Sequence, residues 1–217
     1  RGEDLVGQLQ KSVYLANDQS PNAYWNGDAT NYCPGFDADD VVSHEWSHAY
    51  TEYTADLVYA YQSGALNEGY SDIFGETYDL LNHIEGPLGG TTLTEHKYYE
   101  EGGSRWVMGE DLSEEAAALL LRDMWKPDDF PATTPGKATS GNYACGSGDG
   151  GGVHTNSSVA NHTYAMLVDG TAGQGPVGST GLERASYNGQ SFTGIGIIKA
   201  AHIYFQAHAN YETETTD

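Results

Sequence analysis

The sequence predicts an α+β protein in which short strands come first and helices dominate the last two thirds. Residues 1–35 contain short stretches with Tyr and Val, interrupted by Asn, Asp, Pro and Gly, which is typical of strands and turns. From Asp39 onward, apolar residues recur at helical spacing. A chain of 217 residues is long enough for one or two compact domains. We expect an N-terminal lobe over residues 1–62 and a mainly helical lobe over residues 63–217.

The composition excludes several functions. The chain has 31 Asp and Glu against 9 Lys and Arg, which gives a formal net charge of −22. Nucleic acids and anionic membranes bind clustered Lys and Arg, so neither is expected as the main partner. No apolar run approaches the roughly 18 residues of a membrane span, and the opening residues RGEDLVGQLQ are typical of a processed chain. With 16 Tyr, 4 Trp and 5 Phe, we expect a folded, acidic, soluble protein.

The first elements follow from local signals. Residues 12–15 read as a strand. A helix should run from Asp39 to about Tyr61, with Asp39 or Asp40 as its N-cap. Gln62-Ser63-Gly64 then indicates a turn before a second helix over residues 65–81.

The later elements are mostly helices joined by long loops. Residues 82–103 are rich in Gly and Thr and should be irregular, and Ser113 should cap a short helix that ends at Leu121. Residues 126–152 form a predicted loop. Two further helices are expected at 154–168 and 197–209.

Two cysteines, Cys33 and Cys145, are too few for a disulfide framework or a zinc ribbon. They are either two unrelated buried thiols or, in a secreted protein, one disulfide. Asn156 and Asn161 begin Asn-x-Ser/Thr sequons, which matter only where the source has a glycosylation pathway.

The chemistry is concentrated in His44-Glu45-Trp46-Ser47-His48. Residues four apart lie on one helical face, so both imidazoles can point at one metal ion. Glu45 is offset, and it would reach a water molecule beside the metal instead of the metal itself. The alternative is a pair of surface histidines on an amphipathic helix.

Glu68, 20 residues after His48, supplies the third candidate ligand. A turn at Gly64 would fold the second helix back beside the first and bring Glu68 next to the two histidines. Two His and one Glu leave the fourth tetrahedral position for water, which is typical of a catalytic zinc site. Asp72 lies on the same face and could accept the free N–H of a ligand histidine; alternatively, it is a solvated helix carboxylate. Asn67 would also contact the metal ligands without binding the metal itself.

His44-Glu45-x-x-His48 together with Asn67-Glu68-x-x-x-Asp72 resembles the thermolysin family of zinc endopeptidases. The resemblance implies a thermolysin-like α+β fold with a short β-containing N-terminal part, an active-site helix and a mostly α-helical C-terminal lobe. Three further segments resemble the family's cleft edge strand, its transition-state histidine segment and its late helical region: Asn22–Gly27, Asp149–Ser157 and Gly194–Gly196.

The resemblance assigns roles to single residues. It implies that His44, His48 and Glu68 bind Zn²⁺ and that Glu45 is the general base. The remaining implied roles are oxyanion stabilisation by His154 and Tyr59, orientation of His154 by Asp149, substrate binding by Asn22 and Arg122, and an apolar pocket lined by Val41 and Leu121. Tyr59 and Arg122 could instead serve ordinary helix packing or a surface ion pair.

Calcium is a second ion that the resemblance implies. Asp40, Asp79 and Glu110 fall where the family carries calcium carboxylates, and hard oxygen ligands suit this ion. Arg105 stands where the family's paired site has an acid, so we expect at most one Ca²⁺. The alternative is a solvated acidic cluster.

Relatives of this family carry a longer β-rich lobe before the edge strand and more helices after the late helical region. We therefore expect residues 1–62 to be a partial lobe, completed by another chain or a missing segment. The resemblance also brings Cys33 and Cys145 toward the same cleft, which predicts one disulfide between them.

The sequence thus predicts a secreted zinc endopeptidase that hydrolyses polypeptides with a metal-activated water and prefers an apolar residue after the scissile bond. The alternative is a non-catalytic structural or binding module that retains the peptidase fold. A metal-storage or sensor protein is a poorer alternative, because storage does not require Glu45, Tyr59 and His154 together. Peptide hydrolysis that a zinc chelator abolishes would separate the first possibility from the others.

Overall fold

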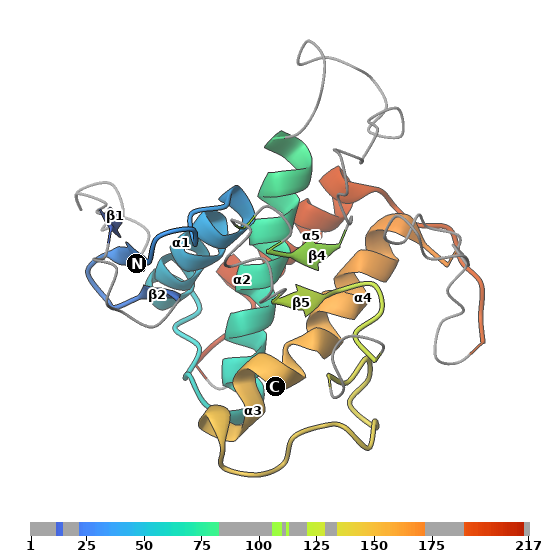
Figure 1. Cartoon of the computed structure of the whole chain (residues 1–217). Helices are drawn as coiled ribbons and strands as arrows, with labels where there is room; N and C mark the ends of the chain where they lie inside the picture. The colour runs from blue at the N-terminus through green and yellow to red at the C-terminus, as the bar shows by residue number, and fades with distance from the viewer. Residues whose placement is uncertain are drawn as a thin grey trace.

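A computed structural model confirms the α+β fold with mostly helices after the first strands, although two short strands also follow the second helix (Figure 1). The first three strands are β1 (Ser12–Tyr14), β2 (Ala23–Trp25) and β3 (Thr30–Tyr32). The structure describes residues 12–14, 22–82, 106–109, 112, 121–128, 134–171 and 189–214. The predicted irregular segment 82–103 and the short helix predicted from Ser113 fall outside these residues, apart from Asn82 and Leu121.

The first sheet has the order β1-β3-β2, so β2 is an edge strand. β3 pairs in parallel with β1 and antiparallel with β2, where Ala23 lies opposite Tyr32. The turn between β2 and β3 is held by Asn26, whose side-chain oxygen accepts the backbone N–H groups of Asp28 and Ala29 at 3.0 and 2.8 Å. This hairpin fixes the edge strand beside the first helix.

A second, two-stranded antiparallel sheet joins β4 (Val107–Met108) to β5 (Arg122–Asp123). Neither strand was predicted from the sequence. Two residues are too few to show an alternating pattern, so the pairing depends on tertiary contacts. The pairing places Arg122 opposite Met108.

The first helix, α1 (Asp39–Tyr53), ends earlier than predicted. Thr54 donates its hydroxyl to the carbonyl of Tyr50 at 2.7 Å, and the N–H of Asp56 turns back to the carbonyl of Thr51 at 2.8 Å. Asp56 has a positive φ of 54°, which ends the helical path. Residues 54–60 therefore form an irregular link, and Tyr59 lies in this link and not on the helix.

The N-cap prediction for α1 is also wrong. Ala38 occupies the N-cap position without a side-chain hydrogen bond, and Asp39 and Asp40 lie in the first turn. Asp40 instead uses one carboxylate oxygen to accept the backbone N–H of Val41 at 2.7 Å and the other to accept that of Gly109 at 2.6 Å. It thereby connects α1 to the second sheet.

The second helix, α2 (Tyr61–Asn82), begins four residues before its predicted start and continues through Gly64. The predicted turn at Gly64 is wrong. A Cβ atom at Gly64 would lie 2.5 Å from Cγ1 of Val153 and 3.0 Å from the carbonyl carbon of Tyr59. Gly64 therefore permits a close contact between elements and does not break the helix. The predicted lobe boundary at residues 62 and 63, which falls in the first turn of α2, stays a prediction.

α2 occupies the middle of the helical part and contacts each of the other four helices that lie within the described residues (Figure 1). These are α1, α3 (Asp149–Asn156), α4 (Ser158–Asp169) and α5 (Ile197–Asn210). The predicted helix at 154–168 is in fact two helices, α3 and α4. α3 begins within the predicted 126–152 loop, where Gly150, Gly151 and Gly152 have positive φ values of 60°, 99° and 81°. The predicted helix at 197–209 matches α5 closely.

Two apolar clusters hold these elements together. The larger joins α2, α4 and α5 to the second sheet, and its buried members are Ile73, Leu80, Trp106, Met124, Trp125, Tyr164, Ala165, Met166, Val168, Ile197 and Ala200. The smaller lies between the first sheet and α1, and its buried members are Ala23, Tyr32, Cys33, Phe36, Val41 and Leu112. Within the described part of the chain, none of the helices combines the length and apolarity that crossing a bilayer requires.

The predicted disulfide is wrong. Cys33 is buried in the smaller apolar cluster, whereas Cys145 is exposed in the loop before α3, and the two are not bonded. The Cys145 thiol lies 3.7 Å from the carbonyl oxygen of Tyr143. Cys33 therefore lies in the core and Cys145 at the surface.

This arrangement predicts two kinetically distinct thiols. In native protein without reductant, a thiol reagent should modify Cys145 rapidly and Cys33 only after unfolding, because a buried sulfur is inaccessible. Titration in denaturant should then give two thiols per chain. A count of zero in denaturant would restore the disulfide.

Gly75 predicts a second outcome, for stability. A Cβ atom there would lie 2.6 Å from the backbone oxygen of Asp40, which cannot move without shifting α1. Although Ala favours helix formation, we expect Gly75→Ala to lower the free energy of unfolding by about 1–3 kcal/mol in urea titration. Gly141→Ala is the matched control, because nothing lies within 4 Å of its Cβ position. Equal or greater stability of Gly75→Ala would contradict the close packing of α1 on α2.

Candidate metal centre

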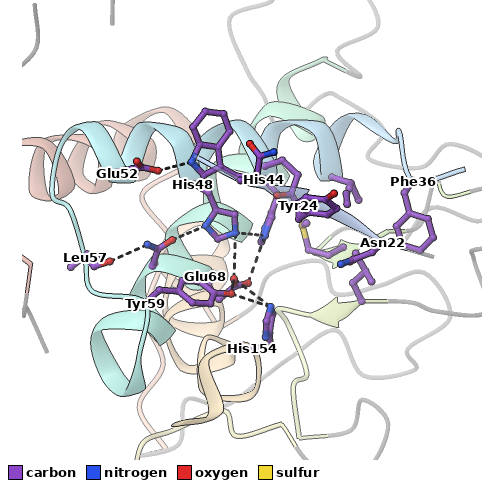
Figure 2. A pocket seen from close by; sticks show the side chains of 18 of the residues that line it. Asn22, Tyr24, Phe36, His44, His48, Glu52, Leu57, Tyr59, Glu68 and His154 are labelled. Atoms are coloured by element: carbon purple, nitrogen blue, oxygen red, sulfur yellow. Dashed lines mark hydrogen bonds and ion pairs between the residues drawn. The ribbon is translucent and has the colours of Figure 1, made fainter. Parts of the chain in front are cut away.

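A cavity of about 820 Å³ lies between β2, α1, α2, β5 and α3. Figure 2 shows side chains from these elements pointing into it, with His44, His48, Tyr59 and His154 arranged around Glu68. Most of the predicted site residues line it: Asn22, Val41, His44, Glu45, His48, Tyr59, Asn67, Glu68, Leu121, Arg122 and His154. Asp72 and Asp149 are not part of the wall but contact residues that are.

Three side chains converge at the centre of this cavity. The Nε2 atoms of His44 and His48 lie 3.0 Å apart, and they lie 3.6 and 3.3 Å from the two carboxylate oxygens of Glu68. One ligand atom from each residue lies within 4.8 Å of the others, so the three could hold one metal ion. Helical spacing positions the two histidines, and the packing of α2 on α1 positions Glu68.

Nδ1 of each histidine, on the side of the ring away from Glu68, contacts residues of α2. His48 Nδ1 lies 2.7 Å from Oδ1 of Asn67 and 3.1 Å from Oγ of Ser71. His44 Nδ1 lies 2.8 Å from Oδ1 of Asp72. Because Asn67 and Asp72 present acceptor oxygens, we assign the proton of each neutral imidazole to Nδ1, which leaves both Nε2 atoms facing the centre of the cavity.

The charges in this centre perturb one another. Burial acts to lower the pKa of His48, but its hydrogen bond with Glu68 and the charges of Glu68 and Glu45 outweigh burial and raise the pKa to about 9. Burial alone would raise the pKa of Glu68, yet His48, His44 and Arg122 hold it well below its usual value. The Glu68 carboxylate is therefore ionised at neutral pH. A metal ion would displace the proton that this charge favours on His48, because a coordinating imidazole is neutral.

Asp72 is completely buried behind the centre. Its Oδ1 accepts a hydrogen bond from Arg122 Nη2 at 2.6 Å, and its Oδ2 lies 2.5 Å from Arg122 Nε. Although burial acts to raise the pKa of Asp72, the charges of Arg122 and His44 lower it. Burial acts to lower the pKa of Arg122, but the charges of Asp72 and Glu68 raise it. Arg122 is thus anchored on Asp72 and also lies 3.6 Å from Glu68 Oε2.

Tyr59 and His154 approach Glu68 from the other side. The Tyr59 hydroxyl donates a short hydrogen bond to Glu68 Oε1 and lies 3.3 Å from His154 Nε2. Asp149 accepts both the ring Nδ1–H of His154, at 2.6 Å, and its backbone N–H, at 3.0 Å. Burial and the nearby Glu68 charge raise the pKa of Tyr59, so its hydroxyl stays protonated. The Tyr59 hydroxyl and His154 Nε2 therefore face the same region of the cavity, and Nε2 can donate a hydrogen bond only when the imidazole carries a proton on both nitrogens.

One wall of the cavity is apolar. Val41, Phe36, Met108 and Leu121 line it, and Val41 and Met108 are almost completely buried. Asn22 lies just before β2, whose outer edge has no partner strand among the described residues. Farther along β2, Trp25 donates its indole N–H to Glu52 at 2.6 Å.

Two residues that support the proposed metal ligands, Ser71 and Asn161, were not predicted from the sequence. Ser71 contacts His48, and Asn161 donates its amide to Asp72 Oδ2 at 2.7 Å. A signal for Asn161 was present, because it shares a helical face with the buried residues Tyr164, Ala165 and Val168, where a polar residue needs a partner. Both sequon asparagines are buried: Asn156 binds the backbone of Ala144, and Asn161 binds Asp72.

The calcium residues are only partly described. Asp40 and Asp79 are both buried, and Asp40 holds the backbone of Val41 and Gly109. Glu110 and Arg105 lie outside the described residues. Calcium binding therefore stays a prediction.

Comparisons with known proteins agree with this architecture. Residues 55–217 match the family model described as "Thermolysin metallopeptidase, alpha-helical domain". The chain is 35% identical over 202 residues to a zinc metalloproteinase of Renibacterium salmoninarum, covering 90% of this chain and 31% of that protein. It is 32% identical over 222 residues to bacillolysin of Bacillus cereus, and this match covers 98% of this chain and 33% of that protein. It is 35% identical over 205 residues to thermolysin of Alicyclobacillus acidocaldarius subsp. acidocaldarius, covering 90% and 31%.

The fold also resembles a solved structure, the precursor of protealysin, a metalloproteinase from Serratia proteamaculans. The TM-score is 0.65 at 23% identity, and the match covers 97% of this chain and 59% of that one. The helical domain and its convergent His, His and Glu define a metallopeptidase-type fold. The chain belongs to the thermolysin metallopeptidase family, and it spans about a third of the length of the curated relatives that it matches.

His44, His48 and Glu68 fit the zinc ion that this family implies. Two imidazole nitrogens and one carboxylate form a donor set that suits Zn²⁺ and leaves one tetrahedral position open. Glu68 Oε2 is buried and has no hydrogen-bond donor. Because an unpartnered buried carboxylate oxygen is costly, a cation at this position would stabilise it.

Proposed function

We propose that this chain carries the catalytic centre of a zinc-dependent endopeptidase, with His44, His48 and Glu68 as the metal ligands. The convergence of their ligand atoms within 4.8 Å, on a wall of an open cavity, is the observation that carries the proposal. Bound Zn²⁺ would supply a Lewis acid that polarises the scissile carbonyl and acidifies a water molecule. Asn67 and Asp72 would keep both imidazoles in the ligating orientation.

Glu45 is the proposed general base. It is 5% exposed, lines the cavity beside both histidines, and is not held by a hydrogen bond to another described residue. A carboxylate in that position can accept a proton from the attacking water and later transfer it to the leaving amine. The proton transfer needs no covalent intermediate with the protein.

His154 and Tyr59 are the proposed donors to the developing oxyanion. The Tyr59 hydroxyl oxygen and His154 Nε2 lie 3.3 Å apart, and Asp149 accepts the Nδ1–H of His154, so His154 would donate from Nε2 as the imidazolium. Donors that are already oriented stabilise charge in the transition state without reorganisation. In the free protein the Tyr59 hydroxyl donates to Glu68, so substrate binding would redirect it toward the substrate oxygen.

Substrate binding would use the edge strand and the apolar wall. We propose that Asn22 hydrogen-bonds to the substrate backbone and that Arg122, held by Asp72, donates to a substrate carbonyl on the other side. Val41 and Leu121, with Phe36 and Met108, would receive an apolar side chain just after the scissile bond. An apolar wall rejects charged side chains because burying an unpaired charge is costly.

Three wider proposals depend on the family and not on the site. We propose that the protein acts outside the cell, that Asp40, Asp79 and Glu110 bind one Ca²⁺, and that another chain or segment completes the lobe around the first sheet. Mass spectrometry and metal analysis of the native protein would test the last two together.

The competing proposal is a non-catalytic binding module that retains this fold. A binding module does not require a buried Glu45 that makes no hydrogen bond to another described residue, nor a His154 that Asp149 orients. Hydrolysis of casein or a furylacryloyl peptide, abolished by a zinc chelator and restored by Zn²⁺, would decide for the enzyme. Binding of peptides without any turnover would decide for the module.

Replacing the proposed base predicts loss of turnover without loss of metal. Glu45→Gln should retain zinc and the fold but lower kcat by at least about a hundredfold, because a carboxamide cannot accept the proton. Glu52→Gln makes the same change at another carboxylate that lines the cavity and should stay within about threefold of the parent. Activity of Glu45→Gln within tenfold of the parent would contradict the proposed role of Glu45 as the general base.

The apolar wall predicts the cleavage preference. In a peptide library, Leu and Phe should be favoured just after the scissile bond over Asp and Lys by about tenfold or more, which corresponds to roughly 1.4 kcal/mol. Leu121→Ala should weaken discrimination among large apolar side chains. A preference for Asp or Lys at this position would refute the assignment of the wall.

A further inference from the structure

The carboxylate of Asp72 is held by four donor atoms that are not equivalent. Two of them make aligned hydrogen bonds: Arg122 Nη2 to Oδ1 at 2.6 Å, and Asn161 Nδ2 to Oδ2 at 2.7 Å. His44 Nδ1 and Arg122 Nε lie at 2.8 and 2.5 Å as close charge contacts, off the hydrogen-bond direction. In the part of the chain that the structure describes, Asn161 therefore makes the only aligned hydrogen bond to Oδ2.

The amide nitrogen of Asn161 makes its hydrogen bond to Asp72. Asn161 is completely buried, and Nδ2 must face Asp72 because a carboxylate oxygen only accepts hydrogen bonds. Its Oδ1 has no hydrogen-bond donor. Keeping this oxygen unsatisfied carries a cost, which indicates that the orientation of the amide is set by Asp72.

A glycine on α2 makes this contact geometrically accessible. A Cβ atom at Gly69 would lie 2.8 Å from the Cβ of Ala160 and 3.5 Å from Oδ1 of Asn161. Gly69 therefore lets α4 approach α2 closely enough for the short Asn161 side chain to reach Asp72. Gly69 directly follows the proposed ligand Glu68 in the sequence.

We propose that Asn161 is a positioning residue for the metal centre. Its hydrogen bond fixes the plane of the Asp72 carboxylate so that Oδ1 faces His44 while Oδ2 stays between Asn161 and Arg122. Without Asn161, the carboxylate can rotate toward the guanidinium of Arg122 and withdraw Oδ1 from the imidazole. The His44 ring would then lose the partner that sets its orientation and basicity.

This inference rests on the proposed zinc site, and the experiment separates the two. The zinc dissociation constant is measured by competition with a chromogenic chelator, and folding is followed by thermal unfolding of the metal-free protein. Asn161→Ala should weaken zinc binding about tenfold, at the lower end of the effect of groups behind metal ligands. Thr163→Ala, an exposed change on the same helix, should stay within twofold.

A second variant and a double substitution test the same contact by other routes. Gly69→Ala keeps the amide of Asn161 but pushes α4 away, and it should also weaken zinc binding severalfold. In an Asp72→Asn background, Asn161→Ala should add less than a twofold change, because the residue through which it acts is already altered.

The outcomes are distinct. A parent chain that does not bind zinc refutes the proposed function and this inference with it. A zinc-binding parent whose folded Asn161→Ala variant binds zinc within twofold refutes the positioning role alone, even where its thermal stability falls. A full tenfold effect that persists in the Asp72→Asn background would show that Asn161 does not act through Asp72.

Discussion

Four carboxylates are buried along one face of the central helix, and the structure around α2 depends on satisfying them. Glu68, Asp72, Glu76 and Asp79 recur at intervals of four, four and three residues, and none is more than 5% exposed. A buried carboxylate is tolerated only with compensating charges or hydrogen bonds. Asp72 binds Arg122 and Asn161, and Glu76 accepts the backbone N–H of Trp106 at 2.8 Å. Glu68 faces the two histidines of α1.

The partners of these carboxylates come from different parts of the chain, and this explains the architecture. α1 supplies the histidines, β5 supplies Arg122, Trp106 just before β4 supplies its backbone N–H, and α4 supplies Asn161. Glycines on α2 allow that approach: Gly75 lies against α1, Gly69 against α4 and Gly64 against α3. The same packing that satisfies the buried charges therefore brings together the three proposed metal ligands.

Much of the centre was predictable from sequence because its parts are local. His44, Glu45 and His48 are set by helical spacing, and Glu68 with Asp72 by the same spacing on the next helix. The end of α1 was not predictable, because the Thr54 hydroxyl and the Asp56 N–H terminate it through hydrogen bonds to backbone carbonyls of α1, which carry no sequence pattern. Gly64 was misread as a turn signal, since glycine marks either a turn or a close contact and only the neighbour Val153 distinguishes them. Asn161 and the strand containing Arg122 depend on tertiary contacts, which a single sequence does not display. The disulfide failed for the same reason, because a shared cleft does not place two sulfur atoms in contact.

The central claim is that Glu68, and not the equally buried Asp72, completes the metal centre with His44 and His48. A crystal structure of the zinc-loaded protein, with anomalous scattering recorded at the zinc absorption edge, tests it most directly. One anomalous peak is expected at about 2.0–2.2 Å from Nε2 of His44, Nε2 of His48 and a carboxylate oxygen of Glu68, with Asp72 still in contact with His44 Nδ1. A peak bound by Asp72 in place of Glu68, or located away from the two histidines, would contradict it.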